Sequence, residues 1–235
     1  MISMHFETAV TAARANPAGR SRRLSSGPLA RALVALMIVL FAAGAFAPRA
    51  AMADPGSTPL GVAQSMVSRA IAIMANKAVP VTQRRRDLRA AIESSFDFTE
   101  MSRSALGYNW RTITPAQRTD FAQLFTAFIE DAYLSKIQDY SGQQVQFSGQ
   151  TPLGPGYTQI DSTLVQPGKN AIAVNYLLLQ KNGSWKIYDV TVDAISIISN
   201  YRNQFNRVIN EKGFNQLIAD LRAKQQQLAS QLGGN

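Results

Sequence analysis

Few side chains in this protein can carry out acid–base or nucleophilic chemistry. The chain has no cysteine, and its single histidine, His5, lies close to the N-terminus. The rest of the chain, after His5, cannot form a Ser-His-Asp or Cys-His catalytic arrangement or a common zinc site, because each needs histidine or cysteine. The remaining candidates are carboxylates, and Asp189 and Asp193 stand four residues apart in a predicted strand.

In an extended strand these two carboxylates would lie about 13 Å apart. Paired catalytic carboxylates are separated by roughly 5 to 9.5 Å, so the pair fits neither catalytic geometry without a bend in the strand. We therefore expect no catalytic residue, no cofactor and no metal ion.

Four arginines gather on one face of a helix predicted over residues 82–95. They are Arg84, Arg85, Arg86 and Arg89. A charge cluster of this kind is usually a solvated helix face. The alternative is a surface that contacts anionic lipid or an acidic partner. Both interpretations place the four guanidinium groups in solvent.

The N-terminal segment has the pattern of an export signal. Basic residues precede the apolar run ALVALMIVLFAAGAFA (32–47), and Ala51-Met52-Ala53 forms a cleavage site. The run has 16 residues, whereas a membrane-spanning helix needs about 20. We therefore predict a cleaved signal peptide over residues 1–53, a polar linker over 54–59 and a single domain over 60–235. Export to the periplasm leads us to expect no nucleic-acid partner.

Helical periodicity dominates both ends of this domain. Helices are predicted over residues 60–78, 82–95, 96–107, 115–140, 195–212 and 214–232. The helix over 115–140 has the clearest signal, because Thr114 and Gln117 flank a proline in a capping sequence. A wide aromatic stripe follows. Such a stripe is core packing more often than the wall of a ligand site.

Between the helices the apolar period changes to two, which is typical of strands. Strands are predicted over residues 144–148, 157–166, 171–181 and 184–193, with a loop over 151–156. Asn182-Gly183 joins the last two strands in a hairpin. These elements predict an α+β fold, a twisted antiparallel sheet of about four strands wrapped by the N- and C-terminal helices.

A regular ladder in this hairpin starts with Lys181 opposite Ser184. It pairs Leu178 with Ile187, Tyr176 with Asp189, Val174 with Thr191, Leu177 with Tyr188, Asn175 with Val190 and Ala173 with Val192. Both faces are then largely apolar near the middle, although an antiparallel sheet normally wets one face. Two covers are needed. Either helices cover both faces in an ordinary three-layer core, or one face lines a cavity.

Two stretches of the domain are distinctive, LGYNWRTITPAQRTDFAQLFTAFIEDAYLSKIQDYSG (106–142) and VNYLLLQKNGSWKIYDVTVDAISIISNYRNQF (174–205). Both resemble the MlaC-like family of periplasmic phospholipid-binding proteins, also called toluene-tolerance auxiliary proteins. The resemblance covers about residues 60–225. It departs after the last strand, where the family often has Val-Glu-Gly-x-Ser and this chain has Ala194 at the glycine position. That leaves the branch open, since related proteins are associated with hopanoid lipids.

The resemblance implies a deep apolar pocket between the sheet and the helices. It also implies a carrier, not an enzyme, that takes a glycerophospholipid across the periplasm. The implied partners are an inner-membrane ABC transporter complex and an outer-membrane lipoprotein complex. A carrier of a hopanoid-type lipid and a ligand-free periplasmic adapter are the alternatives.

On this basis twelve side chains are candidates to line the pocket. They are Trp110, Phe125, Ile129, Tyr133, Val174, Tyr176, Leu178, Ile187, Val190, Val192, Ile198 and Tyr201. For each of them the alternative is plain core packing. At the pocket mouth, Arg103, Arg111 and Arg202 are candidates to bind a headgroup phosphate through charge-assisted hydrogen bonds. The alternative is that these three arginines lie in solvent or form structural ion pairs. Arg84, Arg85, Arg86 and Arg89 are the candidate partner surface.

Overall fold

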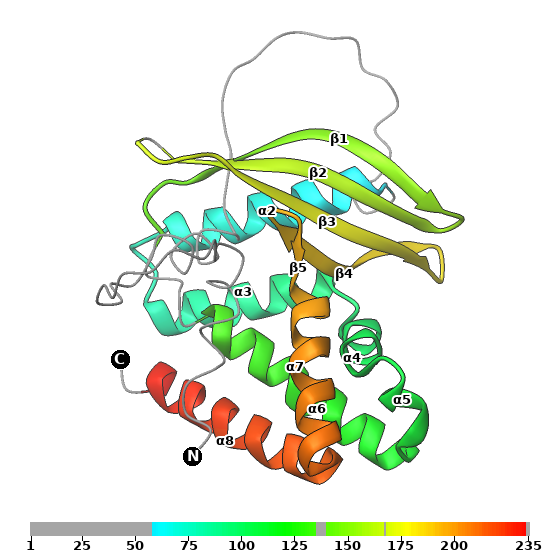
Figure 1. The fold of residues 1–235 in the computed structure, drawn as a ribbon. Coiled ribbons are helices and arrows are strands. Elements are labelled where there is room, and N and C mark those ends of the chain that lie inside the picture. Colours follow the sequence, from blue (N-terminus) through cyan, green and yellow to red (C-terminus); the bar gives the residue numbers. More distant parts are fainter. Residues whose placement is uncertain (1–57, 135–139, 167, 234–235) are drawn as a thin grey trace, which may run out of the picture.

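The computed structural model describes residues 58–134, 140–166 and 168–233. The predicted signal peptide and most of the predicted linker lie outside these residues. Figure 1 shows one twisted sheet with the helices gathered on one of its faces. This arrangement confirms the predicted α+β class.

Seven helices are described. They are α2 (Pro59–Ala75), α3 (Val81–Ser95), α4 (Phe98–Leu106), α5 (Asn109–Thr112), α6 (Pro115–Leu134), α7 (Ile197–Lys212) and α8 (Phe214–Gly233). The predicted cap of α6 is confirmed, because Thr114 and Gln117 exchange two reciprocal hydrogen bonds of 2.9 and 3.2 Å. The helix predicted to reach residue 140 is described only as far as Leu134, and residues 135–139 lie outside the described part.

Five strands form the sheet, in sequential and antiparallel order. They are β1 (Gln144–Gly154), β2 (Tyr157–Val165), β3 (Ile172–Lys181), β4 (Ser184–Val192) and β5 (Ile195–Ser196). The loop predicted over residues 151–156 is wrong, because β1 continues through most of it. Pro152 lies in this edge strand, where a missing N–H does not interrupt the sheet. The helix predicted from residue 195 begins two residues later, because β5 precedes it.

The register of the β3–β4 hairpin differs from the regular ladder. Lys181 pairs with Ser184 and Leu178 with Ile187, as predicted, but a bulge follows. Tyr188 is the extra residue, and beyond it Leu177 pairs with Asp189. The bulge shifts every later pair by one residue, so the predicted pairs beyond Ile187 are wrong.

The shift gathers the apolar side chains on one face of the sheet. Tyr176 now pairs with Val190, and Val174 pairs with Val192. All four are buried. On the opposite face Leu179 is buried and Asn175 is half-buried, while Ala173 is exposed. The helices lie on one face of the sheet (Figure 1), so the expectation of two covers is wrong.

The helices on the buried face form successive layers (Figure 1). α2 lies directly against the sheet and contacts β1, β2 and β4, while α4 and α7 also contact β4. Farther from the sheet, α6 packs against α8 and α4. One continuous apolar core runs through these layers. The space between β4, α4, α6 and α7 is where the candidate site lies.

Candidate functional site

A partly open cavity of about 40 Å³ lies between the buried face of the sheet and the helices. Its walls come from α2, α3, α4, α6, α7 and the strands β3 and β4. The lining residues are Met66, Ile92, Phe96, Phe98, Met101, Ile129, Glu130, Tyr133, Tyr176, Asp189, Val190, Ile197 and Ile198. Apart from two carboxylates and two phenol groups, these side chains are apolar. A cavity of this composition suits a hydrocarbon ligand.

Local structure holds the α4 wall of the cavity against the sheet. The backbone N–H of Asp97 donates to the carbonyl of Ile187 at 2.8 Å, just before α4 begins. The Asp97 carboxylate then caps α4 by accepting from the N–H of Glu100. These two bonds fix the helix start beside β4, and Phe98 and Met101 on α4 line the cavity as a result.

Five of the twelve predicted pocket residues line this cavity. They are Ile129, Tyr133, Tyr176, Val190 and Ile198. The cavity also has walls that we did not single out as pocket residues. Of these, Met66 and Ile92 occupy inward positions of the N-terminal helices, which the helical period indicates. The lining by Phe96 and Phe98 depends on how α4 docks on β4, and the local sequence does not specify that docking.

Two of the predicted pocket residues belong to an aromatic cluster instead. Phe125 is fully buried, with its ring centroid 5.6 Å from that of Tyr201 and 5.5 Å from that of Phe205. Phe121 and Phe128 complete the cluster between α6 and α7. Their edge-to-face and stacked rings are ordinary core packing. The cluster packs beside the cavity, and its aromatic side chains do not line the cavity.

The other predicted pocket residues lie outside the cavity as well. Val174, Leu178, Ile187 and Val192 are buried in the core against the sheet face. Trp110 is half-buried on α5, where the guanidinium of Arg118 lies 5.8 Å from the centre of its ring. Whether any of these residues contacts a ligand stays a prediction.

Glu130 is a buried carboxylate in the cavity wall. Its side chain is 5% exposed, and its Oε2 lies 3.1 Å from Nε of Arg89. Its other oxygen, Oε1, is buried and accepts no hydrogen bond from any residue that the structure describes. Burial raises the pKa of Glu130 to about 7, against the opposing effect of Arg89.

Asp189 is the second carboxylate of the wall, and it has a structural role. It accepts hydrogen bonds from the N–H groups of Val190 and Ile198 and from the hydroxyl of Ser196. Burial raises its pKa, which these three bonds partly offset. Asp193 is exposed and accepts from the N–H of Ala173. The two aspartates therefore each have hydrogen-bond partners of their own within the fold.

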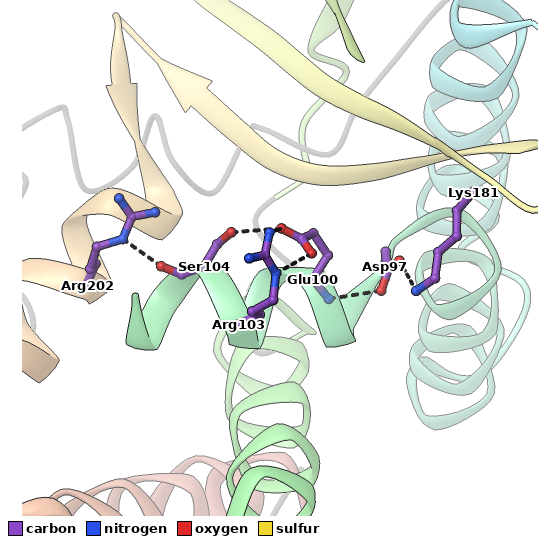
Figure 2. A network of polar contacts seen from close by, with 6 residues as sticks. All are labelled: Asp97, Glu100, Arg103, Ser104, Lys181 and Arg202. Atoms are coloured by element: carbon purple, nitrogen blue, oxygen red, sulfur yellow. Dashed lines mark hydrogen bonds and ion pairs between the residues drawn. The ribbon is translucent and has the colours of Figure 1, made fainter. Parts of the chain in front are cut away.

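Figure 2 shows where two of the three predicted mouth arginines lie. Arg103 forms a two-bond ion pair with Glu100 of the same helix, at 2.5 and 2.7 Å. Nε of Arg202 donates to the carbonyl of Ser104 at 2.6 Å and so joins α7 to α4. Arg111 is exposed on α5. Two of the three guanidinium groups thus already have structural partners.

The predicted arginine face of α3 is not a solvated surface. Arg84 and Arg85 are buried. Arg84 donates to the carbonyls of Met74 and Val79, just at and beyond the end of α2. Arg85 donates to the carbonyl of Leu232 in the last turn of α8 at 2.6 Å. Cationic groups at helix C-termini satisfy carbonyls that have no partner within the helix.

The other two arginines of α3 differ from this pair. Arg89 bridges to Glu130 and Asp131 of α6. Arg86 is exposed and donates to Gln83 on its own helix. A partner surface made of all four arginines is therefore ruled out, and only Arg86 and part of Arg89 face solvent.

Two further features bear on the kind of protein this is. Within the described ranges, no group of three or more histidine, cysteine, aspartate or glutamate side chains is placed to hold a metal ion. None of the helices in those ranges is long and apolar enough to cross a membrane.

The fold and the cavity can be set beside known proteins. A solved phospholipid-binding protein from Ralstonia solanacearum, in complex with a phospholipid, has a similar structure. The TM-score is 0.64 at 21% sequence identity, over 72% of this chain and 97% of that chain. At this identity the likeness establishes the fold alone.

Sequence comparison gives the relationship directly. The intermembrane phospholipid transport system binding protein MlaC of Haemophilus influenzae is 28% identical over 130 residues, which is 54% of this chain and 59% of the relative. The chain thus matches about three-fifths of that relative's length. Residues 64–223, well over half of the chain, match the family described as MlaC protein. The chain belongs to the MlaC family.

Proposed function

We propose that this protein is a periplasmic carrier that binds a phospholipid by its acyl chains and passes it between membrane complexes. The observation that carries the proposal is the apolar cavity between sheet and helices, in a chain of the MlaC family. The names of the Haemophilus and Ralstonia relatives support a phospholipid as the ligand. The partner complexes are the two that the family resemblance implies, one at each membrane.

The energetics of lipid transfer explain why a carrier needs an enclosed site. Two sixteen-carbon chains contain about thirty methylenes, and removing them from water is worth roughly 24 kcal/mol at ~0.8 kcal/mol each. The bilayer supplies the same burial. A protein that left much of the chains in water could not compete with the bilayer. Because the chains dominate this free energy, we expect weak selectivity for the headgroup.

The cavity must widen before it can hold an acyl chain. Its volume of about 40 Å³ has room for only about three water molecules. Two methionines, Met66 and Met101, line it from α2 and α4. Unbranched methionine side chains adapt to a new shape more easily than branched ones. We therefore propose that lipid enters by displacing the walls formed by α2 and α4, while the aromatic cluster between α6 and α7 stays packed.

Among the three predicted mouth arginines, Arg111 is the one that we propose for a headgroup contact. Arg103 would have to leave its ion pair with Glu100, and Arg202 its bond to Ser104. Arg111 is exposed and would lose no such bond. The guanidinium group of Arg111 is therefore available to form charge-assisted hydrogen bonds with a headgroup phosphate.

A matched pair of core substitutions tests the carrier function. Ile129→Phe enlarges a side chain that lines the cavity, whereas Leu217→Phe enlarges a buried side chain of α8 outside it. Overpacking costs each variant roughly 1 to 3 kcal/mol of stability. Each folded variant is stripped of lipid and incubated with vesicles of phosphatidylethanolamine and phosphatidylglycerol, and phospholipid bound per protein is measured after separation.

We expect the Ile129 variant to bind less than half as much phospholipid per folded molecule as the Leu217 variant, which binds like the wild type. Equal binding by both variants would show that the cavity is not the lipid site. No binding by the wild type would overturn the carrier function itself and favour a ligand-free adapter.

A further inference from the structure

We propose that loading of the cavity by an acyl chain is coupled to protonation of Glu130, so that the protein takes up a proton as it takes up lipid and gives it back on release. The inference rests on the proposed function, because it requires hydrocarbon in the cavity. It assigns to Glu130 a control of lipid affinity that is separate from the shape of the pocket.

Glu130 lies in the cavity wall, with Met66, Ile92 and Ile129 as apolar neighbours in the lining. Only one of its oxygens has a partner, the 3.1 Å contact to Arg89. Oε1 is buried and accepts no hydrogen bond from the described part of the chain. An ionised oxygen that is buried without a partner is costly, whereas a neutral carboxyl group is much less so.

Arg89, the cation that pairs with Glu130, is shared between two carboxylates. Nη2 of Arg89 bonds Asp131 at 2.5 Å, while Nε of the same guanidinium faces Glu130. Arg89 is also 41% exposed, so water weakens its attraction for both carboxylates. One partly solvated arginine therefore serves two buried carboxylates, and Glu130 is the one that faces the cavity.

Among the described residues, the other charged groups that act directly on Glu130 are carboxylates. From α3, the Glu93 carboxyl group lies within hydrogen-bonding reach of Glu130 and adds a like charge, and from α6 itself Asp131 adds another. From α8, Gln225 contacts Asp131 and is neutral. Across the cavity, Asp189 of β4 is a further carboxylate, with Arg202 of α7 among the groups that act on it. The balance of these groups and burial raises the pKa of Glu130 to about 7, close to physiological pH.

An acyl chain in the cavity shifts this balance further. Protein atoms cover Oε1 itself, but the empty cavity has room for about three water molecules beside the Glu130 side chain. The dipoles of such water favour the ionised form. Hydrocarbon replaces that water and gives no hydrogen bond. The chain therefore binds the neutral form of Glu130 more tightly than the ionised form, and by linkage the loaded protein holds its proton to higher pH.

The sign of the pH effect follows. Below pH 7 Glu130 is already neutral in the empty protein, and lipid binds without a proton change. Above pH 7 each loading event must bring a proton, so the affinity falls as pH rises, by at most about tenfold per pH unit. Acidification therefore favours loading, and alkalinisation favours release.

Calorimetric titration of the purified, lipid-free protein tests the coupling. The probe is dioctanoyl-phosphatidylglycerol below its micelle concentration, because its phosphate does not titrate between pH 6 and 8. Titrations at pH 7.5 in buffers of different ionisation enthalpy report the number of protons taken up. The matched variants are Glu130→Gln, which keeps the shape but cannot ionise, and Glu211→Gln, an exposed site on α7.

We expect the wild type and the Glu211 variant to take up about three-quarters of a proton per lipid at pH 7.5, because that fraction of Glu130 is ionised half a unit above a pKa of about 7. Their dissociation constants should rise about tenfold from pH 6 to pH 8. Glu130→Gln should take up no proton and should bind at both pH values like the wild type at pH 6. Binding without proton uptake, or a pH dependence that persists in Glu130→Gln, would overturn the coupling and leave the carrier function intact. No binding at any pH would overturn the carrier function.

Discussion

Oδ1 of Asp189 accepts a hydrogen bond of 3.1 Å from the backbone N–H of Ile198, so that strand β4 holds the first turn of helix α7. The same carboxylate accepts from Val190 and Ser196. Asp189 and Ile198 both line the cavity. The angle between the sheet and α7, and with it one wall of the cavity, therefore depends on one buried aspartate.

Asp189→Asn should lower the free energy of unfolding by about 1 to 3 kcal/mol, because an amide NH₂ would replace one of the two accepting oxygens. Asp193→Asn is the matched control. Asp193 is exposed and accepts a single bond, which the amide oxygen can keep. Urea unfolding curves of the two variants and the wild type measure the difference. Similar midpoints for both variants would show that Asp189 does not brace α7.

The buried face of the sheet shows what the sequence could not reveal. The period-two pattern predicts β3 and β4 correctly, and Asn182-Gly183 fixes the start of their register. A bulge at Tyr188 then changes which residues pair. No local signal marks it, because the bulge is favoured by the gathering of Val190 and Val192 on the face that the helices cover. That gain arises only from tertiary packing.

The candidate site was predictable to a similar degree. Side chains with a clear helical or strand period, such as Ile129 and Tyr176, reach the cavity. Phe125 has the same pattern but packs into the aromatic cluster. Periodicity identifies the inward face of a helix, and it cannot tell a cavity wall from a packed core. The prediction that Arg84 and Arg85 face solvent failed for a related reason. Arg84 caps the end of the preceding helix α2 and Arg85 that of the distant helix α8, and the helical period indicates neither contact.

The buried position of Arg84 gives a second stability prediction. Arg84→Met removes the donors to the carbonyls of Met74 and Val79. It should cost about 1 to 3 kcal/mol, since buried acceptors are left without partners. Arg86→Met, at the exposed neighbouring position, should change stability by less than about 0.5 kcal/mol. Thermal unfolding of both variants checks this, and equal melting temperatures would mean that Arg84 is not a structural residue.

The turn between β4 and β5 is strained at the position where the family often has glycine. Ala194 has a φ of 65°, in the left-handed region that glycine adopts without cost. Ala194→Gly should therefore stabilise the protein by about 1 kcal/mol. Ala90→Gly, at an exposed position inside α3, should destabilise it by about as much. If both glycines destabilise the protein in chemical unfolding, the strain at Ala194 is not present in solution.

The burial of Glu130 predicts a pH dependence of stability in the lipid-free protein. Its pKa is raised from 4.5 to about 7 on folding, so its neutral form favours the folded state. The contribution is fully present below pH 4.5 and is lost as pH rises to about 7, by at most about 1.4 kcal/mol per pH unit. The wild type is compared with Glu130→Gln, because every other titrating group contributes equally to the two proteins. We expect the stability difference between the two to change across this window, and a constant difference would contradict the assignment.

The central claim is that the interior of this protein holds phospholipid. The most direct test is mass spectrometry of the purified protein under native conditions, followed by organic extraction and identification of what is released. We expect the release of a phospholipid in stoichiometric amount, and its chain count would give the capacity of the widened cavity. Release of a hopanoid-type lipid would contradict the proposal that the ligand is a phospholipid. An unliganded mass that persists after incubation with phospholipid vesicles would contradict the carrier function.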